Sequence, residues 1–211
     1  MAIDTYETAP RLSPLEKYEW DDIWWDNAPD TEGKRILIIG DSISHGTRRA
    51  AGKLEGRTVF IDGIATSKAV DNPAFFTLLN YFAEAGHTYE AVFFNNGLHG
   101  WHLDEEKYAP LFTELAKFIK ERFAPKKFFI VLTTPVRKSK QTEIFDDINP
   151  RVLVRNSAAL ETARELGAEV VDLYSLIENR PELYTQDGVH LIDEGYALLA
   201  RKLLTSENFV I

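Results

Sequence analysis

Three short segments, far apart in the chain, contain the residue types that acyl transfer requires. The first, Gly40-Asp41-Ser42, follows a hydrophobic run and supplies a hydroxyl nucleophile. A second hydrophobic run leads into Asn95-Asn96-Gly97-Leu98-His99, whose polar side chains can stabilise an oxyanion, and Asp187-Gly188-Val189-His190 supplies a carboxylate and an imidazole. An α/β protein builds its site on the loops that leave its strands, so the pattern favours the chemistry of a serine hydrolase.

Ser42 follows the apolar run Arg35–Gly40 and a glycine turn, which places its hydroxyl at the carboxyl edge of a sheet and at the start of a helix. Backbone N–H groups at a helix N-terminus can stabilise a developing oxyanion. The alternative interpretation is that Asp41 and Ser42 only cap this helix. Gly-Asp-Ser alone does not decide between the two.

The Asp187/His190 pair completes a possible catalytic triad. A serine hydroxyl is a poor nucleophile until a base takes its proton, and the imidazole works best when a carboxylate fixes its tautomer. An isolated D-x-x-H is more often an Asp-Gly turn beside a structural histidine. Together with Ser42 at a strand end, the catalytic interpretation is favoured.

Two common motifs are excluded around Ser42. The segment is not a G-x-S-x-G elbow, because Ser44 stands where the second glycine would be. A P-loop also does not fit, because Gly46 to Lys53 has the wrong spacing and Leu54 replaces the hydroxyl residue. A phosphate-binding α/β domain that uses the loop from Gly40 to Gly46 stays as an alternative hypothesis.

Short apolar runs alternate with helical periodicity from Arg35 onward, which predicts an α/β fold: a three-layer α/β/α sandwich around a five-stranded parallel sheet. Asn72-Pro73 and Asn149-Pro150 are expected to start helices, and Gly167 to end one. Further helices are expected over 104–123 and about 193–204. The expected strands are Arg35–Gly40, Thr58–Ile61, Ala91–Asn95, Phe128–Thr133 and Glu169–Asp172.

The 211 residues fit one domain, which we place at 35–211, preceded by an aromatic-rich arm at 1–34 that packs on it. In the arm, Tyr18, Trp20, Trp24 and Trp25 could line a sugar-binding platform, but aromatic residues in a terminal arm more often fasten it to the core. Packing is therefore the favoured interpretation.

The charge balance argues against two classes of partner. The chain has 24 Lys and Arg residues and 33 Asp and Glu residues, and the resulting net charge of -9 would repel nucleic acid and anionic membranes. The absence of cysteine excludes disulfides and thiol chemistry. Residues 1–10 show no secretory signal pattern, so we expect a cytoplasmic protein. The sequence leaves the oligomeric state open.

Residues 35 to about 204 resemble the SGNH, or GDSL, hydrolase family. Within them, the sequences of three segments are similar to an uncharacterised bacterial branch of that family. The resemblance implies a flavodoxin-like fold, with Ser42 as nucleophile, its N–H and that of Gly63 in the oxyanion hole, and Asp187 and His190 completing the triad. The branch-like segments are Ile64–Ser67, Asn95–Gly100 and Thr133–Arg137.

The third family block departs from the usual Gly-x-Asn-Asp, because Gly97-Leu98-His99-Gly100 puts a histidine at the Asn position. We expect His99 to donate to the oxyanion, with Asn96 as the competing donor. In the structural alternative, His99 bonds the loop, and Asn95 or Asn96 ties strand ends together.

Two further possibilities concern residues near this edge. His99 and His102, with Asp104 and Glu105, could suggest a metal site, but no third ligand is indicated and we expect none. Arg137 could bind an acidic or sugar group of a substrate, although a solvated arginine is the more usual explanation.

The expected activity is hydrolysis of a carboxylic ester without a cofactor. The resemblance implies a small-molecule or oligosaccharide substrate, with an acetyl ester of a carbohydrate as the best match and short-chain lipid esters or thioesters next. The opposing hypothesis is a sugar-binding module of the same fold that has lost turnover.

Overall fold

Five parallel strands form the centre of the computed structural model, which describes residues 14–205. Their order across the sheet is β3 (Phe60–Thr66), β2 (Arg35–Gly40), β4 (Ala91–Phe94), β5 (Lys127–Val131) and β8 (Glu169–Val171). Every residue of β2 is buried, as expected of a strand covered on both faces. The predicted three-layer α/β/α architecture with a parallel core is confirmed, and the strand order is the flavodoxin-like one.

A sixth strand corrects the prediction of a five-stranded sheet. Strand β1 (Asp21–Trp24) lies antiparallel to β3, with Asp21 opposite Thr66 and Trp24 opposite Gly63. Its sequence, Asp-Asp-Ile-Trp, contains no apolar run, because an edge strand is exposed on one side. The N-terminal arm therefore extends the sheet at its β3 edge.

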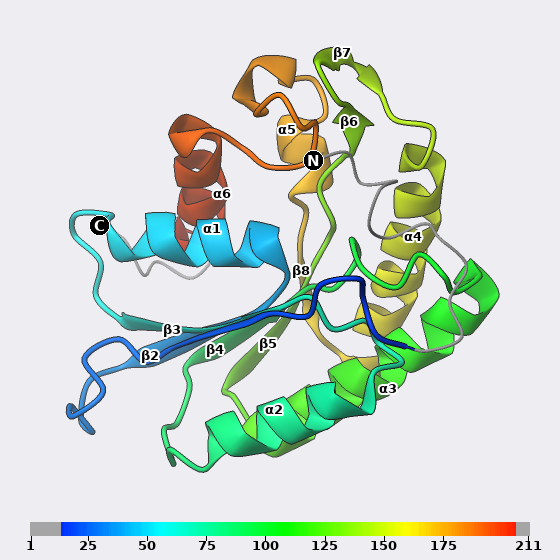
Figure 1. Cartoon of the computed structure of the whole chain (residues 1–211). Helices are drawn as coiled ribbons and strands as arrows, with labels where there is room; N and C mark the ends of the chain where they lie inside the picture. Colours follow the sequence, from blue (N-terminus) through cyan, green and yellow to red (C-terminus); the bar gives the residue numbers. More distant parts are fainter. Residues whose placement is uncertain (1–13, 206–211) are drawn as a thin grey trace.

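Helices cover both faces of the sheet (Figure 1). On one side lie α1 (Ser42–Gly52), α5 (Tyr174–Ile177) and α6 (Asp193–Thr205). On the other lie α2 (Pro73–Ala83) and α3 (Glu105–Phe123), while α4 (Asn149–Leu166) packs against α3 and β5. The two apolar clusters between the sheet and these helices hold the strand ends in place.

The helix ends follow the expected capping chemistry with one exception. The side chain of Asn72 accepts from the N–H of Ala74 and caps α2, and Gly167 takes the left-handed conformation that ends α4. Asn149 does not cap α4, because it is the first residue of that helix and its Oδ1 accepts from the N–H of Val136. It fastens α4 to the loop that follows β5.

Strand β3 continues five residues beyond the predicted end at Ile61. The charged Asp62 within it is fully buried but is bonded by Arg35 at 2.9 Å and by the Tyr89 hydroxyl at 3.1 Å. These two partners offset the cost of burying a carboxylate. An apparent strand end in the sequence is therefore the middle of the strand.

A small hairpin and a 3₁₀ turn stand above the carboxyl edge near β5. The hairpin pairs β6 (Arg137–Lys138) with β7 (Gln141–Phe145), and the turn spans Pro181–Leu183. Within residues 14–205, no helix is long and apolar enough to cross a membrane. The first 13 residues of the predicted arm lie outside the described part.

Candidate active site

Ser42 is the first residue of α1, directly after the turn that follows β2. Asp41 caps the helix, since its Oδ1 accepts from the N–H of Ile43 at 2.9 Å and of Ser44 at 3.4 Å. A side chain at Gly40 would meet Ser44 Oγ at 2.2 Å and the carbonyl of Asn95 at 2.8 Å, so this tight turn requires glycine. The side chain of Asp41 already accepts from the N–H groups of Ile43 and Ser44 that a phosphate at this helix start would need, which disfavours the phosphate-binding hypothesis.

His190 reaches Ser42 from the loop that precedes α6. Its Nε2 lies 2.8 Å from Ser42 Oγ, and its Nδ1 lies 2.8 Å from Asp187 Oδ2. Both distances are those of good hydrogen bonds. The structure thus brings together the nucleophile, the base and the orienting carboxylate that the sequence predicted.

The charge of Asp187 fixes the tautomer of His190. Burial raises the pKa of this carboxyl, but hydrogen bonds from the His190 ring and from the N–H groups of Val189 and His190 outweigh it, so the pKa lies well below its usual range. An ionised carboxylate only accepts, so Nδ1 of the neutral ring carries the hydrogen. Nε2 is then the acceptor for the Ser42 hydroxyl, as a general base must be.

The loop that holds Asp187 and His190 is closed by its own backbone. The N–H of Thr185 donates to the carbonyl of His190 at 2.8 Å, and the Thr185 hydroxyl donates to Asp187. Gly188 has φ +80, and a side chain there would lie 2.1 Å from the carbonyl of Arg137. The N–H of Arg137 in turn donates to the carbonyl of Gly188. The hairpin therefore fixes the position of the catalytic loop.

Arg137 supports this loop instead of facing the nucleophile. Its buried guanidinium donates to the carbonyls of Thr142 and Glu178 and lies over the rings of Phe145 and Tyr184. Arg137 is 3% exposed and two of its nitrogens donate to backbone carbonyls, so it is not open to a substrate group. The structure does not support the predicted substrate-binding role of Arg137.

Gly63 is not brought to Ser42. It lies inside β3, opposite Ile38 of β2, and Ile38 is four residues before Ser42 in the chain. Its backbone is flanked by β2 and β1, and a side chain there would meet Arg48 at 2.4 Å. The expected oxyanion role of Gly63 is corrected, because β3 ends at Thr66 and only residues beyond that point reach the edge.

Asn95 and Asn96 tie the loops of the sheet edge together. The Nδ2 of Asn95 donates to the carbonyl of Val131 and to the hydroxyl of Thr133, which uses both its hydrogens. The Nδ2 of Asn96 donates to the carbonyl of Lys68 at 3.0 Å. Asn96 therefore links the loop after β4 to the loop after β3, and one of its amide hydrogens has no assigned acceptor.

His99 lies in the same loop, and its side chain faces the N-terminal arm. Its Nδ1 is 3.9 Å from Oε1 of Glu16, which also accepts from the N–H of Gly100 at 3.1 Å. His102 bonds Asp71 at 2.7 Å. Among residues 14–205, no group of three or more His, Asp or Glu side chains is placed to hold a metal ion.

The contribution of the arm to this edge was missed by the sequence analysis. Lys68 bonds both carboxylate oxygens of Asp21 at 2.8 Å, and Glu19 accepts from Ser67 and Asn72. The arm is thus bonded to the loop after β3, and through Glu16 to the loop after β4. The acidic residues on both sides of Trp20 were the available signal.

Arg155 of α4 is a second residue that sequence reasoning missed. Its guanidinium, 1% exposed, donates to the carbonyls of Gly97, His99 and Gly100 at 3.1, 2.6 and 2.9 Å. It also stacks on the ring of Trp101. Together with Arg151, which donates to the carbonyls of Trp101 and Leu103, Arg155 sets the course of the loop after β4. The sequence of α4 does not indicate this role.

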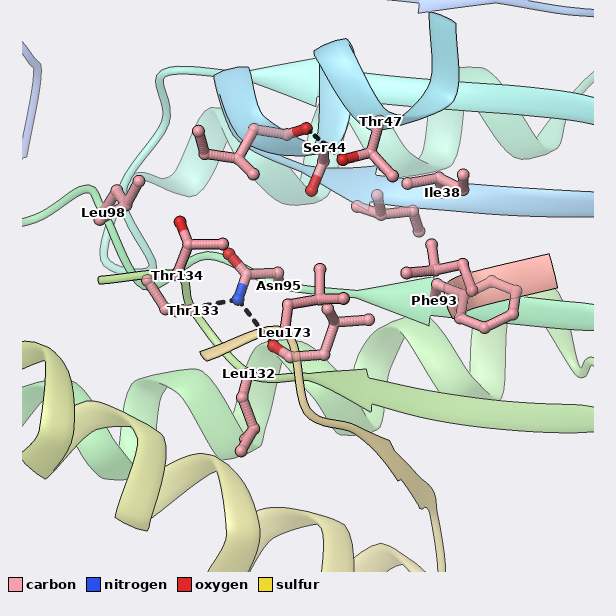
Figure 2. A pocket seen from close by; sticks show the side chains of 14 residues that line it. Ile38, Ser44, Thr47, Phe93, Asn95, Leu98, Leu132, Thr133, Thr134 and Leu173 are labelled. Atoms are coloured by element: carbon pink, nitrogen blue, oxygen red, sulfur yellow. Dashed lines mark hydrogen bonds between the residues drawn. The ribbon is translucent and has the colours of Figure 1, made fainter. Parts of the chain in front are cut away.

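Two hollows lie against α1, one at its first turns and the other along its second half. The first is a cavity of about 20 Å³ next to Ser44, which is room for about one water molecule, and Figure 2 shows Asn95, Thr133 and Thr134 among the side chains that line it. A larger groove of about 380 Å³ runs over Gly46 and Arg49 of α1, and Lys53 just after it, to Tyr196 of α6. Only the groove has the size of a ligand site.

Comparison with known proteins gives a likeness at the level of the fold. No protein-family model and no curated protein sequence matches the chain. Solved structures do match: a lipolytic protein of the G-D-S-L family from Veillonella parvula has a TM-score of 0.61 and 16% identity, covering 83% of this chain and 99% of its own. The chain has the fold of the SGNH/GDSL hydrolases.

Two further matches carry named activities. An acetylxylan esterase from Geobacillus stearothermophilus has a TM-score of 0.60 and 15% identity, covering 83% of this chain and 95% of its own. A GDSL-like lipase from Bacteroides thetaiotaomicron has a TM-score of 0.60 and 18% identity, covering 86% and 90%. At these identities the comparison establishes the arrangement of the elements and leaves the chemistry to the residues of this chain.

Proposed function

We propose that this chain is a serine esterase that cleaves a carboxylic ester through an acyl-enzyme on Ser42. The observation that carries the proposal is the continuous chain of hydrogen bonds from Asp187 through His190 to Ser42. It stands at the carboxyl edge of a parallel sheet, where proteins of this architecture bind their ligands. The fold shared with lipases and acetylxylan esterases agrees with it.

In the proposed reaction, Ser42 Oγ attacks the ester carbonyl carbon while its proton moves to His190 Nε2. The oxyanion of the tetrahedral intermediate accepts from the Ser42 N–H at the positive end of α1. The C–O bond to the alcohol then breaks as His190 returns the proton to the leaving oxygen. Water repeats the sequence on the acyl-enzyme, which releases the acid and restores the Ser42 hydroxyl.

The second oxyanion donor is proposed to be Asn96 or His99. Asn96 has an amide hydrogen without an assigned acceptor, and His99 lies three residues further along the same loop. Asn96→Ala and His99→Ala separate the two. Loss of the true donor should lower kcat by about a hundredfold to a thousandfold. Loss of the other residue should affect stability more than kcat.

The proposed substrate is an acetyl ester of a carbohydrate. The acetylxylan esterase among the structural matches favours this class, and the polar groups around α1 suit a hydroxylated ligand better than a lipid chain. Comparison of acetylated oligosaccharides with short-chain lipid esters and acyl thioesters would identify the class. Faster hydrolysis of a lipid ester or thioester would overturn the carbohydrate assignment.

The decisive test compares Ser42→Ala with Ser44→Ala, a serine two residues further along α1. Wild type and Ser44→Ala should hydrolyse p-nitrophenyl acetate and be labelled by a fluorophosphonate on Ser42, as mapped by mass spectrometry. Ser42→Ala should lose both properties. Equal background hydrolysis by wild type and Ser42→Ala would instead favour the sugar-binding module without turnover.

A further inference from the structure

A mixed aromatic and polar surface begins one helical turn from Ser42, on the side of the arm. His45 is three residues after Ser42 on α1, and residues at this spacing share a helix face. Its Nε2 lies 3.6 Å from Oδ1 of Asp22 in β1, and Arg48 lies 3.7 Å from the same oxygen. Side chains of β1 therefore continue the surface on which the nucleophile stands.

The strand register fixes how far this surface extends. Asp22 is opposite Ala65 of β3, which is opposite Gly40 of β2, so the three residues form one row across the sheet. Trp20 lies two residues closer to the carboxyl edge, as Ser42 does relative to Gly40. Two strand spacings separate β1 from β2, which puts Trp20 about 10 Å to the side of the nucleophile.

Alternation along the arm directs Trp20 and Asp22 to the α1 side. Asp21 faces the other way, toward Lys68, and Asp22 faces His45. The N–H of Ser67 donates to the carbonyl of Trp20, so the strand pairing continues to this residue. Trp20 is 36% exposed, and the side chains of Asp22 and His45 are 41% and 30% exposed.

These groups combine the contacts that a saccharide needs. An indole face can stack on the apolar face of a sugar ring, while a carboxylate accepts from hydroxyl groups. Burial lowers the pKa of His45 despite the neighbouring Asp22, so near neutral pH its ring offers one donor and one acceptor. A lipid chain on the same surface would separate the side chains of Asp22 and His45 from water without replacing their hydrogen bonds.

We propose that Trp20, Asp22 and His45 form a binding subsite for a sugar unit of an oligosaccharide whose acetyl ester lies at Ser42. The inference rests on the proposed esterase function and names the substrate chain that it would take. Because the subsite is displaced from Ser42 by two strands, it contacts a sugar other than the one that carries the ester. Acetylated oligosaccharides should therefore be better substrates than acetylated monosaccharides.

The experiment measures kcat/KM of wild type, Trp20→Ala and Asp22→Asn on acetylated xylotriose, acetylated xylose and p-nitrophenyl acetate. We expect each variant to reduce kcat/KM on xylotriose about tenfold more than on the two small esters, through KM. The inactive Ser42→Ala protein should bind acetylated xylotriose in calorimetry, and Ser42→Ala combined with Trp20→Ala should bind it more weakly.

Trp24→Ala is the matched control. Trp24 is the last residue of β1, which begins directly after Trp20, and alternation puts it on the same side, but it is four residues from Trp20 and its ring is next to the Arg48 guanidinium. This variant should keep the wild-type ratio between the substrates. If Trp20→Ala does not fold, the test uses Asp22→Asn alone, through its kcat/KM on acetylated xylotriose relative to that on the small esters.

Three results would overturn the subsite. One is an equal loss on long and short esters in both variants, which would mean that the arm only positions the loops. Another is a wild-type kcat/KM on all three substrates in both variants. The third is a selective loss in Arg49→Ala, which would put the sugar in the groove between α1 and α6. If wild type hydrolyses no ester at all, the proposed function itself has failed, and that result is distinct from the other three.

Discussion

His190 Nε2 lies 2.8 Å from Ser42 Oγ, although 148 residues separate them in the chain. Ser42 is held by the turn between β2 and α1, and His190 by a loop that closes on itself through the bond from Thr185 N–H to the His190 carbonyl. Each half is held by local bonds, and the hairpin contact at Gly188 together with the packing of α6 on α1 brings the two side chains within hydrogen-bond distance. Perturbing either loop should therefore reduce turnover without contact with substrate.

Gly188→Ala tests the catalytic loop. The new Cβ would lie 2.1 Å from the Arg137 carbonyl, and φ +80 is unfavourable for alanine. Because the position of a Cβ is fixed by its own backbone and the Arg137 carbonyl is itself backbone, no side-chain rotation relieves the clash, so the loop has to move, and Asp187 and His190 move with it. We expect kcat on p-nitrophenyl acetate to fall by about a hundredfold, since small misplacements of catalytic groups have effects of this size.

Gly86→Ala provides the control for backbone strain. Gly86 has φ +74, but a Cβ there would meet nothing within 4 Å. This variant should lose about 1 kcal/mol of stability and keep wild-type kcat. Equal activity of the two variants would show that the contact with Arg137 does not position the triad.

Asp187→Asn should lower kcat by about 10⁴-fold, because an amide no longer selects the tautomer in which Nε2 accepts. The same change removes a stability contribution that depends on pH. The pKa of Asp187 is lower in the folded protein than the ordinary value of 3.8 for an aspartate, so its contribution is present above that pH and is lost as the pH falls through the folded value.

Urea titrations measure that dependence. The free energy of unfolding of wild type should exceed that of Asp187→Asn most at about pH 5 and by less at about pH 2. A difference that stays constant over this range would contradict a depressed pKa at Asp187.

The sequence was sufficient for the parts of the site that depend on local structure. A strand, a glycine turn and a helix place Ser42, and an Asp-x-x-His loop before a helix places the base, so both could be predicted. Gly63 could not be placed, because the burial of Asp62 beside Arg35 depends on partners distant in sequence. Strand β1 could not be predicted either, because its sequence lacks the apolar pattern that indicates a strand and its pairing with β3 joins distant residues.

Arg155→Met tests the cation beneath the loop after β4. Removing the guanidinium leaves the carbonyls of Gly97, His99 and Gly100 buried without their donor. A buried charged hydrogen-bond network that loses one partner costs about 3–5 kcal/mol. We expect a loss of that size in urea unfolding, with Arg155→Lys recovering only part, because an ammonium cannot reproduce the planar fork.

Arg164→Met, on the same helix, is the matched control. Arg164 pairs with Glu161 on the surface, where both side chains are more than two thirds exposed. Its removal should change stability by no more than about 0.5 kcal/mol. A similar cost for the two substitutions would show that Arg155 is no more than a surface charge.

Asp41→Asn separates the capping role of this side chain from its charge. Burial raises the pKa of Asp41 although the N–H groups of Ile43 and Ser44 oppose the shift, so ionisation is unfavourable in the folded protein. A group with a raised folded pKa favours the native state at low pH and loses that contribution as the pH rises. Asparagine caps a helix about as well as aspartate and does not titrate.

The free energy of unfolding of Asp41→Asn relative to wild type should therefore increase from about pH 4 to pH 7. Asp41→Ala, which lacks the cap, should be less stable than Asp41→Asn by about 1 kcal/mol at both pH values. A relative stability that falls with pH would mean that the buried charge itself stabilises the start of α1.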